Sequence, residues 1–419
     1  MSIKLRKAGA NWVDGDKFFD REIEIRALAE RIRDGHHTLL TAQRRMGKTS
    51  LVRELLRRLQ IGGNYETVFV DLEACMDPAD AIAEIAFQAR SVESAWRRIV
   101  SGFANRLQGA WDQVDELGIA ELRIKLRASV DKGTWQADGD RVFQALANCR
   151  KPVVLAIDEL PILVNRMIKG QDFLITGERR KAADSFLSWL RRNGQDHRGR
   201  VHLVLAGSIG LEPVLRQAGL SAHANIYLPY ELHPWEERTA ANCIAALAAE
   251  YELLVPIEVR QWMCRKLRRC IPHHVQQYFD HLHEHLRRRC RSTATVSDAK
   301  SVYERDLLSV RGQIDLEHYQ TRLRMAVGPE SYRTALELMT EAAINDGQLD
   351  HEIVNLYREI EPSGSAIGKI ELDDLLHLLQ HDGYLEPCEG GLRFASGLLE
   401  DWWLARHGRY FKSITERRV

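Results

Sequence analysis

Residues 37–55, HTLLTAQRRMGKTSLVREL, predict the fold of the first part of the chain. A short apolar strand over 38–41 leads into a tight turn at Gly47-Lys48-Thr49, and the amphipathic helix that follows ends at Gly62-Gly63. Backbone N–H groups that converge at the positive end of a helix form a cradle for phosphate. We therefore expect Lys48 to reach the outer phosphates of a nucleotide and the Thr49 hydroxyl to bind Mg²⁺.

The match to the phosphate-loop pattern G-x-x-x-x-G-K-[ST] lacks its first glycine, because Ala42 stands there. Losing a glycine costs on the order of 1 kcal/mol where φ is unfavourable and nothing where it is not. A chance G-K-T at the start of a basic helix is the alternative interpretation. The order strand, loop, helix is the one that the motif requires, so we interpret the loop as functional with one relaxed position.

Composition limits the class of protein. With 419 residues and 45% apolar content, the chain can form two or three domains with proper cores. Lys plus Arg and Asp plus Glu both total 59, which does not indicate a globally basic nucleic-acid binder but leaves local basic patches possible.

Seven scattered cysteines favour free thiols in a reducing cytoplasm. We expect a cytoplasmic protein that does not contact membranes, since no signal-peptide core and no apolar run of roughly 20 residues is evident.

Two further strands end in residues suited to nucleotide chemistry. The run PVVLAIDE, residues 152–159, is typical of a strand buried on both faces, and it ends in Asp158 and Glu159. Beside a phosphate loop, Asp158 can bind the Mg²⁺ shell and Glu159 can polarise the attacking water. The alternative is a strand that simply ends in surface acids. The run VHLVLA, residues 201–206, ends in Gly207-Ser208, where Ser208 can hydrogen-bond the γ-phosphate or the water.

The order of elements predicts an α/β fold: a P-loop NTPase parallel sheet sandwiched by helices, then an α-helical lid and a C-terminal winged-helix domain. Strands are expected at 38–41, 66–72, 152–159, 201–206 and 226–228, with a strand or hairpin at 121–130. Asp20 is expected to cap a helix that ends at Gly35. After Pro234 the strand pattern stops, and three helices followed by a hairpin close the chain. The predicted domains are the ATPase domain at 1–230, the lid at 231–325 and the winged helix at 326–419.

Six segments together resemble a known family. They are FFDREIEI, LLTAQRRMGKTSL, VVLAIDELPIL, VLAGSIGLEPVL, IYLPYELHP and CIPHHVQQYFDHL. In this order and at these intervals they look like the archaeal-type ATPase family of phosphate-loop proteins, which has many bacterial members and is related to the AAA+ and STAND ATPases. The resemblance covers roughly residues 16–405, and the double arginine before M-G-K-T-S-L is its most specific element.

The resemblance implies roles for individual residues. It implies that ATP and Mg²⁺ are bound by the loop residues Ala42, Arg44, Arg45, Met46, Gly47, Lys48, Thr49 and Ser50. Asp158 would be the metal-site carboxylate, Glu159 the catalytic base and Ser208 the sensor at the γ-phosphate. Apart from the resemblance, the entry Phe-Asp-Arg-Glu, which contains Arg21, has two interpretations: it starts a helix that only packs, or it lies beside the nucleotide base. The sequence departs from the family at Ala42 and at Cys270-Ile271-Pro272, where a glycine is expected before the proline.

If ATP lies between subunits, an arginine from the neighbouring subunit is needed, because a guanidinium best meets the transition-state charge on the γ-phosphate. Arg216 lies where related ATPases carry theirs, and Arg191 and Arg192 are rivals. With such an arginine in trans, we expect a homo-oligomer in the ATP state and slow or partner-stimulated turnover.

Three other clusters have competing interpretations. Histidines and cysteines between 264 and 290 suggest zinc, with His281 and His285 one helical turn apart, but long helices without a C-x-x-C clip favour an ordinary structural role. Nine basic residues against two acidic ones between 260 and 292 form either a solvated helix face or a contact for nucleic-acid phosphates over 260–291. From 371 to 391 there are six acidic residues and no Lys or Arg, so we expect the winged helix to dock a protein partner.

We therefore predict an ATP-binding, Mg²⁺-dependent ATPase that acts as a molecular switch on oligomerisation or protein partners. The alternative is a nucleic-acid-associated ATPase such as a loader or an accessory of mobile elements or defence.

Overall fold

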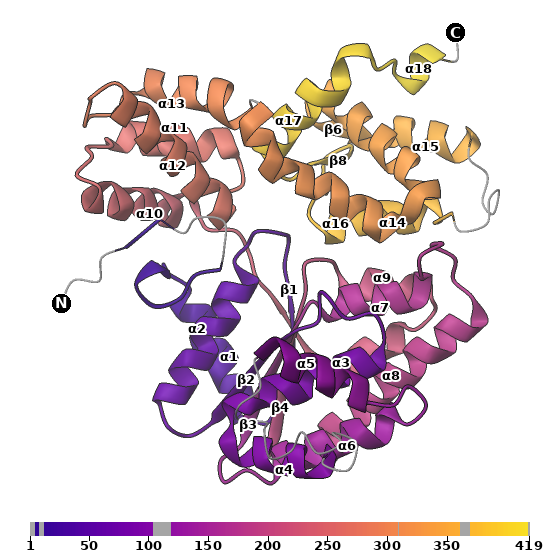
Figure 1. The fold of residues 1–419 in the computed structure, drawn as a ribbon. Coiled ribbons are helices and arrows are strands. Elements are labelled where there is room, and N and C mark those ends of the chain that lie inside the picture. The colour runs from indigo at the N-terminus through magenta and orange to yellow at the C-terminus, as the bar shows by residue number, and fades with distance from the viewer. Residues whose placement is uncertain (1–4, 8–11, 104–118, 309, 361–368, 418–419) are drawn as a thin grey trace. The chain divides into compact units, whose positions relative to one another are not determined.

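The computed structural model describes residues 5–7, 12–103, 119–308, 310–360 and 369–417 (Figure 1). The chain divides into two compact units. Residues 21–41 and 48–231 form the sheet unit. Residues 1–20, 42–47 and 232–419 form the helical unit.

The sheet unit is built on five strands. They are β1 (Thr38–Thr41), β2 (Glu66–Asp71), β3 (Val153–Asp158), β4 (Val201–Ala206) and β5 (Leu228–Glu231). Their order is β2-β3-β4-β1-β5 and every pairing is parallel. All residues of β3 and β4 are buried, as their continuous apolar sequence predicts. Because the strands are parallel, their carboxyl ends lie at one edge of the sheet. The candidate site residues lie at or directly after these strand ends.

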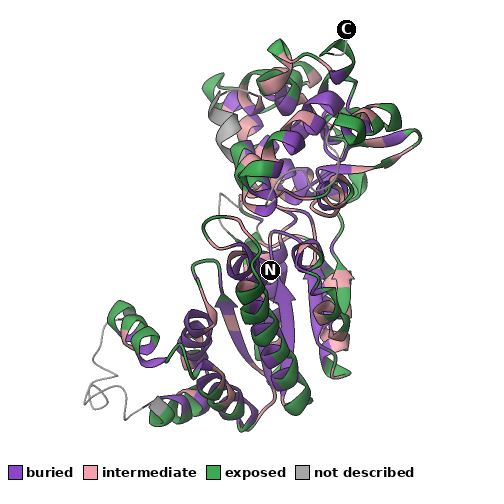
Figure 2. Cartoon of the chain, turned by 90° about the vertical axis from the view of Figure 1, so that its right-hand side faces the viewer, coloured by how far each residue is buried: buried purple, intermediate pink, exposed green. Residues whose placement is uncertain are grey.

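Helices flank this sheet. They are α1 (Glu22–Arg33), α2 (Lys48–Ile61), α3 (Pro78–Gln88), α4 (Glu93–Phe103), α5 (Ile119–Ser129), α6 (Trp135–Ala147), α7 (Leu160–Lys169), α8 (Gly177–Asp196) and α9 (Leu211–Gln217). Exposed residues lie along the outer faces of α1 and α8, whereas β3 and β4 are buried throughout (Figure 2). In α2, for example, Leu51 and Leu55 are fully buried one helical turn apart. The prediction of a parallel α/β sheet flanked by helices is confirmed.

Three local predictions were wrong. Residues 121–130 are helical, because Leu122 and Leu126 lie one turn apart in α5 and pack together on Phe87 of α3. The fifth strand starts at Leu228 instead of 226, and it contains Pro229, which an edge strand tolerates because one side needs no backbone donor. Asp20 does not cap α1; the helix is preceded by Arg21, which has a left-handed φ of 71° and makes no side-chain cap.

The helical unit contains two groups of elements. The first is α10 (Glu237–Glu250), α11 (Ile257–Leu267), α12 (Pro272–Arg288) and α13 (Val296–Val302). The second is α14 (Val310–Ile344), β6 (Gln348–Asp350), α15 (His351–Ile360), α16 (Leu372–His381), β7 (Leu385–Cys388), β8 (Gly391–Phe394), α17 (Gly397–His407) and α18 (Ile414–Arg417). The hairpin β7–β8 was predicted, whereas β6, which pairs antiparallel with β8, was not. The division into lid and winged helix at 325/326 stays a prediction, and α14 runs across it with a kink at Gly328.

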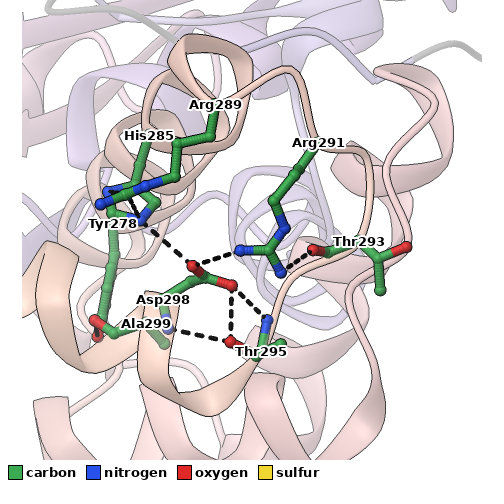
Figure 3. A network of polar contacts seen from close by, with 8 residues as sticks. All are labelled: Tyr278, His285, Arg289, Arg291, Thr293, Thr295, Asp298 and Ala299. Atoms are coloured by element: carbon green, nitrogen blue, oxygen red, sulfur yellow. Dashed lines mark hydrogen bonds and ion pairs between the residues drawn. The ribbon is translucent and has the colours of Figure 1, made fainter.

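Asp298 ties α12 to α13 through a polar network (Figure 3). Its carboxylate and the Thr295 hydroxyl form a capping box, and Arg291 donates to its Oδ1 at 3.0 Å. His285 lies 3.3 Å from the same oxygen. Although desolvation opposes it, hydrogen bonds from Thr295 and the charge of Arg291 lower the pKa of Asp298 to about 2. Arg291 and His285 therefore have structural roles here.

Two questions from the sequence concern a metal site at 264–290 and segments that could span a membrane. Within the described part of the chain, no group of three or more His, Cys, Asp or Glu side chains is arranged to hold a metal ion, including the region 264–290. Among the helices in these ranges, none is both long enough and apolar enough to cross a membrane.

Candidate nucleotide site

The loop between β1 and α2 contains a turn shortly before Lys48, the first residue of α2. Arg45 and Gly47 both have left-handed conformations, with φ of 65° and 84°. Glycine adopts this region freely, whereas for Arg45 it is a strained conformation of the kind that clusters at functional sites. Successive N–H groups in such a turn point toward a common centre. The loop leads directly into Lys48 and Thr49 in the first turn of the 14-residue helix α2, whose dipole favours an anion at this end.

Within the helical unit, the loop residues also have protein contacts. The Gln43 side-chain amide donates to the Gly383 carbonyl at 2.5 Å, and the Arg45 guanidinium contacts the His273 ring. Met46 is almost completely buried. Burial and the nearby charges of Arg322 and Arg45 lower the pKa of Arg44. That these loop residues bind nucleotide stays a prediction.

Thr49 and Asp158 form a pair of oxygen donors at the carboxyl end of β3. The Thr49 hydroxyl donates to Asp158 Oδ2 at 2.6 Å, and the Glu159 N–H donates to Asp158 Oδ1 at 3.0 Å. Asp158 is buried, with 4% of its surface exposed. A hydroxyl and a carboxylate are hard ligands of the kind that Mg²⁺ prefers, and Mg²⁺ usually takes only one or two of them from the protein. The donor set therefore fits this ion.

Glu159 lies in a strained turn between β3 and α7. Its φ of 58° is left-handed, and its Oε2 accepts hydrogen bonds from the Ser208 N–H at 2.8 Å and from the Ser208 hydroxyl at 2.9 Å. Gly207 allows this approach of β4 to α7, because a Cβ at Gly207 would lie 2.4 Å from Cδ of Pro161. The structure thus brings together two residues that the sequence assigned to separate roles.

The predicted arginines have different surroundings. Arg21 is buried and ion-paired with Glu24 at 2.6 Å. Arg192 is ion-paired with Asp140 at 2.8 Å, which makes it a poorer candidate for a contact in trans. Arg216 is exposed in the last turn of α9, where a second subunit could reach it.

Asp71 is a residue of this edge that the sequence analysis missed. It is the last residue of β2 and pairs in register with Asp158. Desolvation of its carboxyl group, together with the negative charges of Asp158, Glu73 and Glu84, raises the pKa of Asp71. The signal was present in the sequence, since ETVFVD ends in an acid just as VVLAID does, but no motif marked it.

Comparisons with known proteins agree with this architecture. Residues 31–215 match the AAA domain family. The matched segment contains β1 to β4 of the sheet. The comparison with curated protein sequences found no match.

Two solved structures share the fold over nearly the whole chain. The Walker-type ATPase PABY2304 of Pyrococcus abyssi superposes with a TM-score of 0.60 at 16% identity, over 96% of this chain and 99% of that chain. The ORC2 protein of Aeropyrum pernix, in a structure of its ADPNP-ADP complexes, superposes with a TM-score of 0.51 at 13% identity, over 94% and 98%. At these identities the likeness shows the fold alone.

Proposed function

We propose that this protein binds ATP with Mg²⁺ and hydrolyses it, and that the nucleotide state switches its oligomerisation or its protein partners. The observation that carries the proposal is the arrangement at the carboxyl edge of the sheet. Thr49 contacts Asp158, the next residue Glu159 contacts Ser208, and Lys48 opens α2 directly before Thr49. These are the oxygen donors, base and cation that phosphoryl transfer requires.

The residues divide the chemistry between binding and proton transfer. Lys48 would neutralise phosphate charge, and Thr49 and Asp158 would hold Mg²⁺, which supplies positive charge to the transferring phosphoryl group. Glu159 would orient the attacking water and accept its proton. Because the Ser208 hydroxyl donates to Glu159, a γ-phosphate that competes for this hydroxyl would change the hydrogen bonding of the base. Ser208 thereby couples the presence of the γ-phosphate to the position of Glu159.

Two variants test binding and chemistry separately. Lys48→Ala should lose ATP binding, whereas Glu159→Gln should bind ATP with Mg²⁺ and fail to release phosphate. The exposed acid Glu73, changed to Gln, is the control and should behave as wild type. Wild-type phosphate release by Glu159→Gln would remove Glu159 as the base, and unchanged binding by Lys48→Ala would contradict the nucleotide site itself.

The switch part of the proposal rests on the helical unit. The elements from the second half of α14 to β8 have the helix, strand, helix, helix, strand, strand order of a winged helix, and the first turn of α16 contains Asp373 and Asp374. An acidic helix at this position favours a protein partner over a DNA duplex. The proposed location of such a switch is the cytoplasm.

A nucleic-acid role is the second candidate, because basic residues are dense between 260 and 291. The structure reduces the cationic surface available for it. Lys266, Arg268 and Arg269 are ion-paired with Asp401, Glu400 and Glu386 of the same unit, at 2.7, 2.7 and 3.3 Å. These ion pairs indicate that the basic residues near the end of α11 help to pack α17 and β7 within the unit. Arg265 and Arg288 remain exposed.

A further inference from the structure

Asp71 and Asp158 are neighbours across two parallel strands. Every residue of β2 pairs in register with β3, and the last pair is Asp71 with Asp158. Adjacent parallel strands lie about 4.8 Å apart, and residues in register project toward the same face of a sheet. Asp71 therefore lies on the face on which Asp158 contacts Thr49 of α2.

Two acids of α3 have basic partners, whereas Asp71 and Asp158 have none among the described residues. On α3, Asp80 is ion-paired with Arg127, and Glu84 is ion-paired with Arg123 at 2.6 Å. Within the described residues, Asp71 and Asp158 take part in no ion pair, and the hydrogen bond that Asp71 accepts comes from the Glu73 N–H at 2.8 Å. Two adjacent carboxylates without a cation are unfavourable unless a cation joins them, because like charges at this spacing repel each other.

We propose that Asp71 is a positioning residue for the Mg²⁺ of the proposed ATP site, which accepts a hydrogen bond from a water molecule bound to the ion. The inference rests on the proposed function. Mg²⁺ dehydrates reluctantly and keeps several waters, so a carboxylate one strand away from its direct ligand is placed to orient one of them. Asp71 is exposed at the strand end, which leaves room for this water.

The proposal predicts effects of opposite sign on the two states of the protein. Without the ion, Asp71 destabilises the fold through repulsion of Asp158, and removing its charge relieves this. With the ion, Asp71 contributes charge and a hydrogen-bond acceptor, and removing it weakens Mg²⁺ binding. A residue with a merely structural role would lower stability in both states.

The experiment compares wild type with Asp71→Asn, Asp71→Glu and the nearby acid control Glu73→Gln. Thermal melting is measured without divalent ions, and Mg²⁺ is then titrated at a fixed excess of a non-hydrolysable ATP analogue. We expect Asp71→Asn to melt at or above the wild-type temperature without Mg²⁺ and to need about tenfold more Mg²⁺ for the half-maximal shift. Asp71→Glu keeps the charge, so its Mg²⁺ concentration for the half-maximal shift should stay within about threefold of the wild-type value. Glu73→Gln should have the wild-type value.

The outcomes separate the inference from the function on which it rests. A wild-type protein that shows no Mg²⁺-dependent shift with the nucleotide overturns both. A wild-type shift that Asp71→Asn reproduces at the same Mg²⁺ concentration overturns the inference alone. The inference is also overturned if Asp71→Asn melts well below wild type without Mg²⁺, because Asp71 would then act through the fold. It is overturned as well if Glu73→Gln loses as much Mg²⁺ affinity as Asp71→Asn, because the effect would then be one of general charge.

Discussion

Glu159 and Ser208 lie 49 residues apart in the chain, and both hydrogen bonds from Ser208 end on one oxygen of the glutamate. The backbone N–H comes from the end of β4, so it persists whatever the side chain of residue 208 is. The hydroxyl is the part of the contact that a ligand or a mutation can change. The backbone N–H of Ser208 therefore makes a fixed contribution to the position of Glu159, and the hydroxyl makes a variable one.

The Ser208→Ala variant tests the variable contribution. It keeps the backbone donor at 2.8 Å and loses the hydroxyl at 2.9 Å, so ATP should bind within about twofold of wild type while turnover falls about tenfold or more. Single-turnover phosphate release and nucleotide affinity measure the two effects. The control is Ser185→Ala on the exposed side of α8, which should change neither. Wild-type turnover in Ser208→Ala would show that the hydroxyl does not act on the base.

Gly207→Ala tests the packing that makes this contact available. The new Cβ would lie 2.4 Å from Cδ of Pro161, so β4 and α7 must separate and the protein should lose about 1–3 kcal/mol of stability. Turnover should fall as well, because Glu159 and Ser208 move apart. Gly177→Ala is the matched control, since no atom lies within 4 Å of a Cβ there and its melting temperature should not fall. Equal melting of the two variants would contradict the close approach of Gly207 to Pro161.

Asp298 predicts a defined pH dependence of stability. Its folded pKa of about 2 lies below the ordinary value of 3.8, so its stabilisation is fully present above pH 3.8 and is lost as the pH falls toward 2. Asp298→Asn should lower the melting temperature at pH 7, where a lost cap costs about 1 kcal/mol. The difference from wild type should shrink when melting is measured at decreasing pH. A difference that is constant from pH 7 to pH 2.5 would show that the charge of Asp298 does not contribute.

The sequence was enough to predict the elements that depend on continuous apolar runs and on local motifs. The strands at 38–41 and 201–206 have the expected bounds, because their apolar runs are interrupted sharply at both ends. The segment 121–130 was misassigned because Leu122 and Leu126 reveal helical spacing only when Phe87 is known to lie beneath them. The contact of Glu159 with Ser208 depends on strand order, and so does the pairing of Asp71 with Asp158. Neither strand order nor register can be derived from single strands without knowing which of them are neighbours.

Turnover per subunit should rise with protein concentration if an arginine completes the site in trans. Arg216 is the proposed residue, because it is exposed in the last turn of α9. Arg216→Ala should lower turnover at high concentration by about 10³-fold or more and change it little at high dilution. The measurement is a dilution series of phosphate release, with Arg192→Ala as the control. A rate per subunit that is fast and independent of concentration would contradict any arginine supplied by a neighbour.

Duplex DNA should bind this protein weakly, with a shallow dependence on salt. Each phosphate that a Lys or Arg neutralises adds about 0.9 to the slope of the logarithm of affinity against the logarithm of salt concentration. In the basic run, Lys266, Arg268 and Arg269 are ion-paired with acids of α17 and β7. The C-terminal end of α12 is exposed, although Arg287 there is ion-paired with Glu284 at 3.1 Å.

The test of this prediction is a salt titration of duplex binding by the full-length protein and by a variant with Arg287, Arg288 and Arg289 changed to Ala. We expect any binding of the wild type to be independent of base sequence and to disappear in the triple variant. The control is Arg358→Ala on α15, whose guanidinium is 2.6 Å from Asp373 and which should leave binding unchanged. Tight, sequence-selective binding that survives the triple variant would place the contact on the C-terminal elements. It would then favour a nucleic-acid role over a protein-docking one, because a recognition helix needs side chains that reach base edges as well as phosphates.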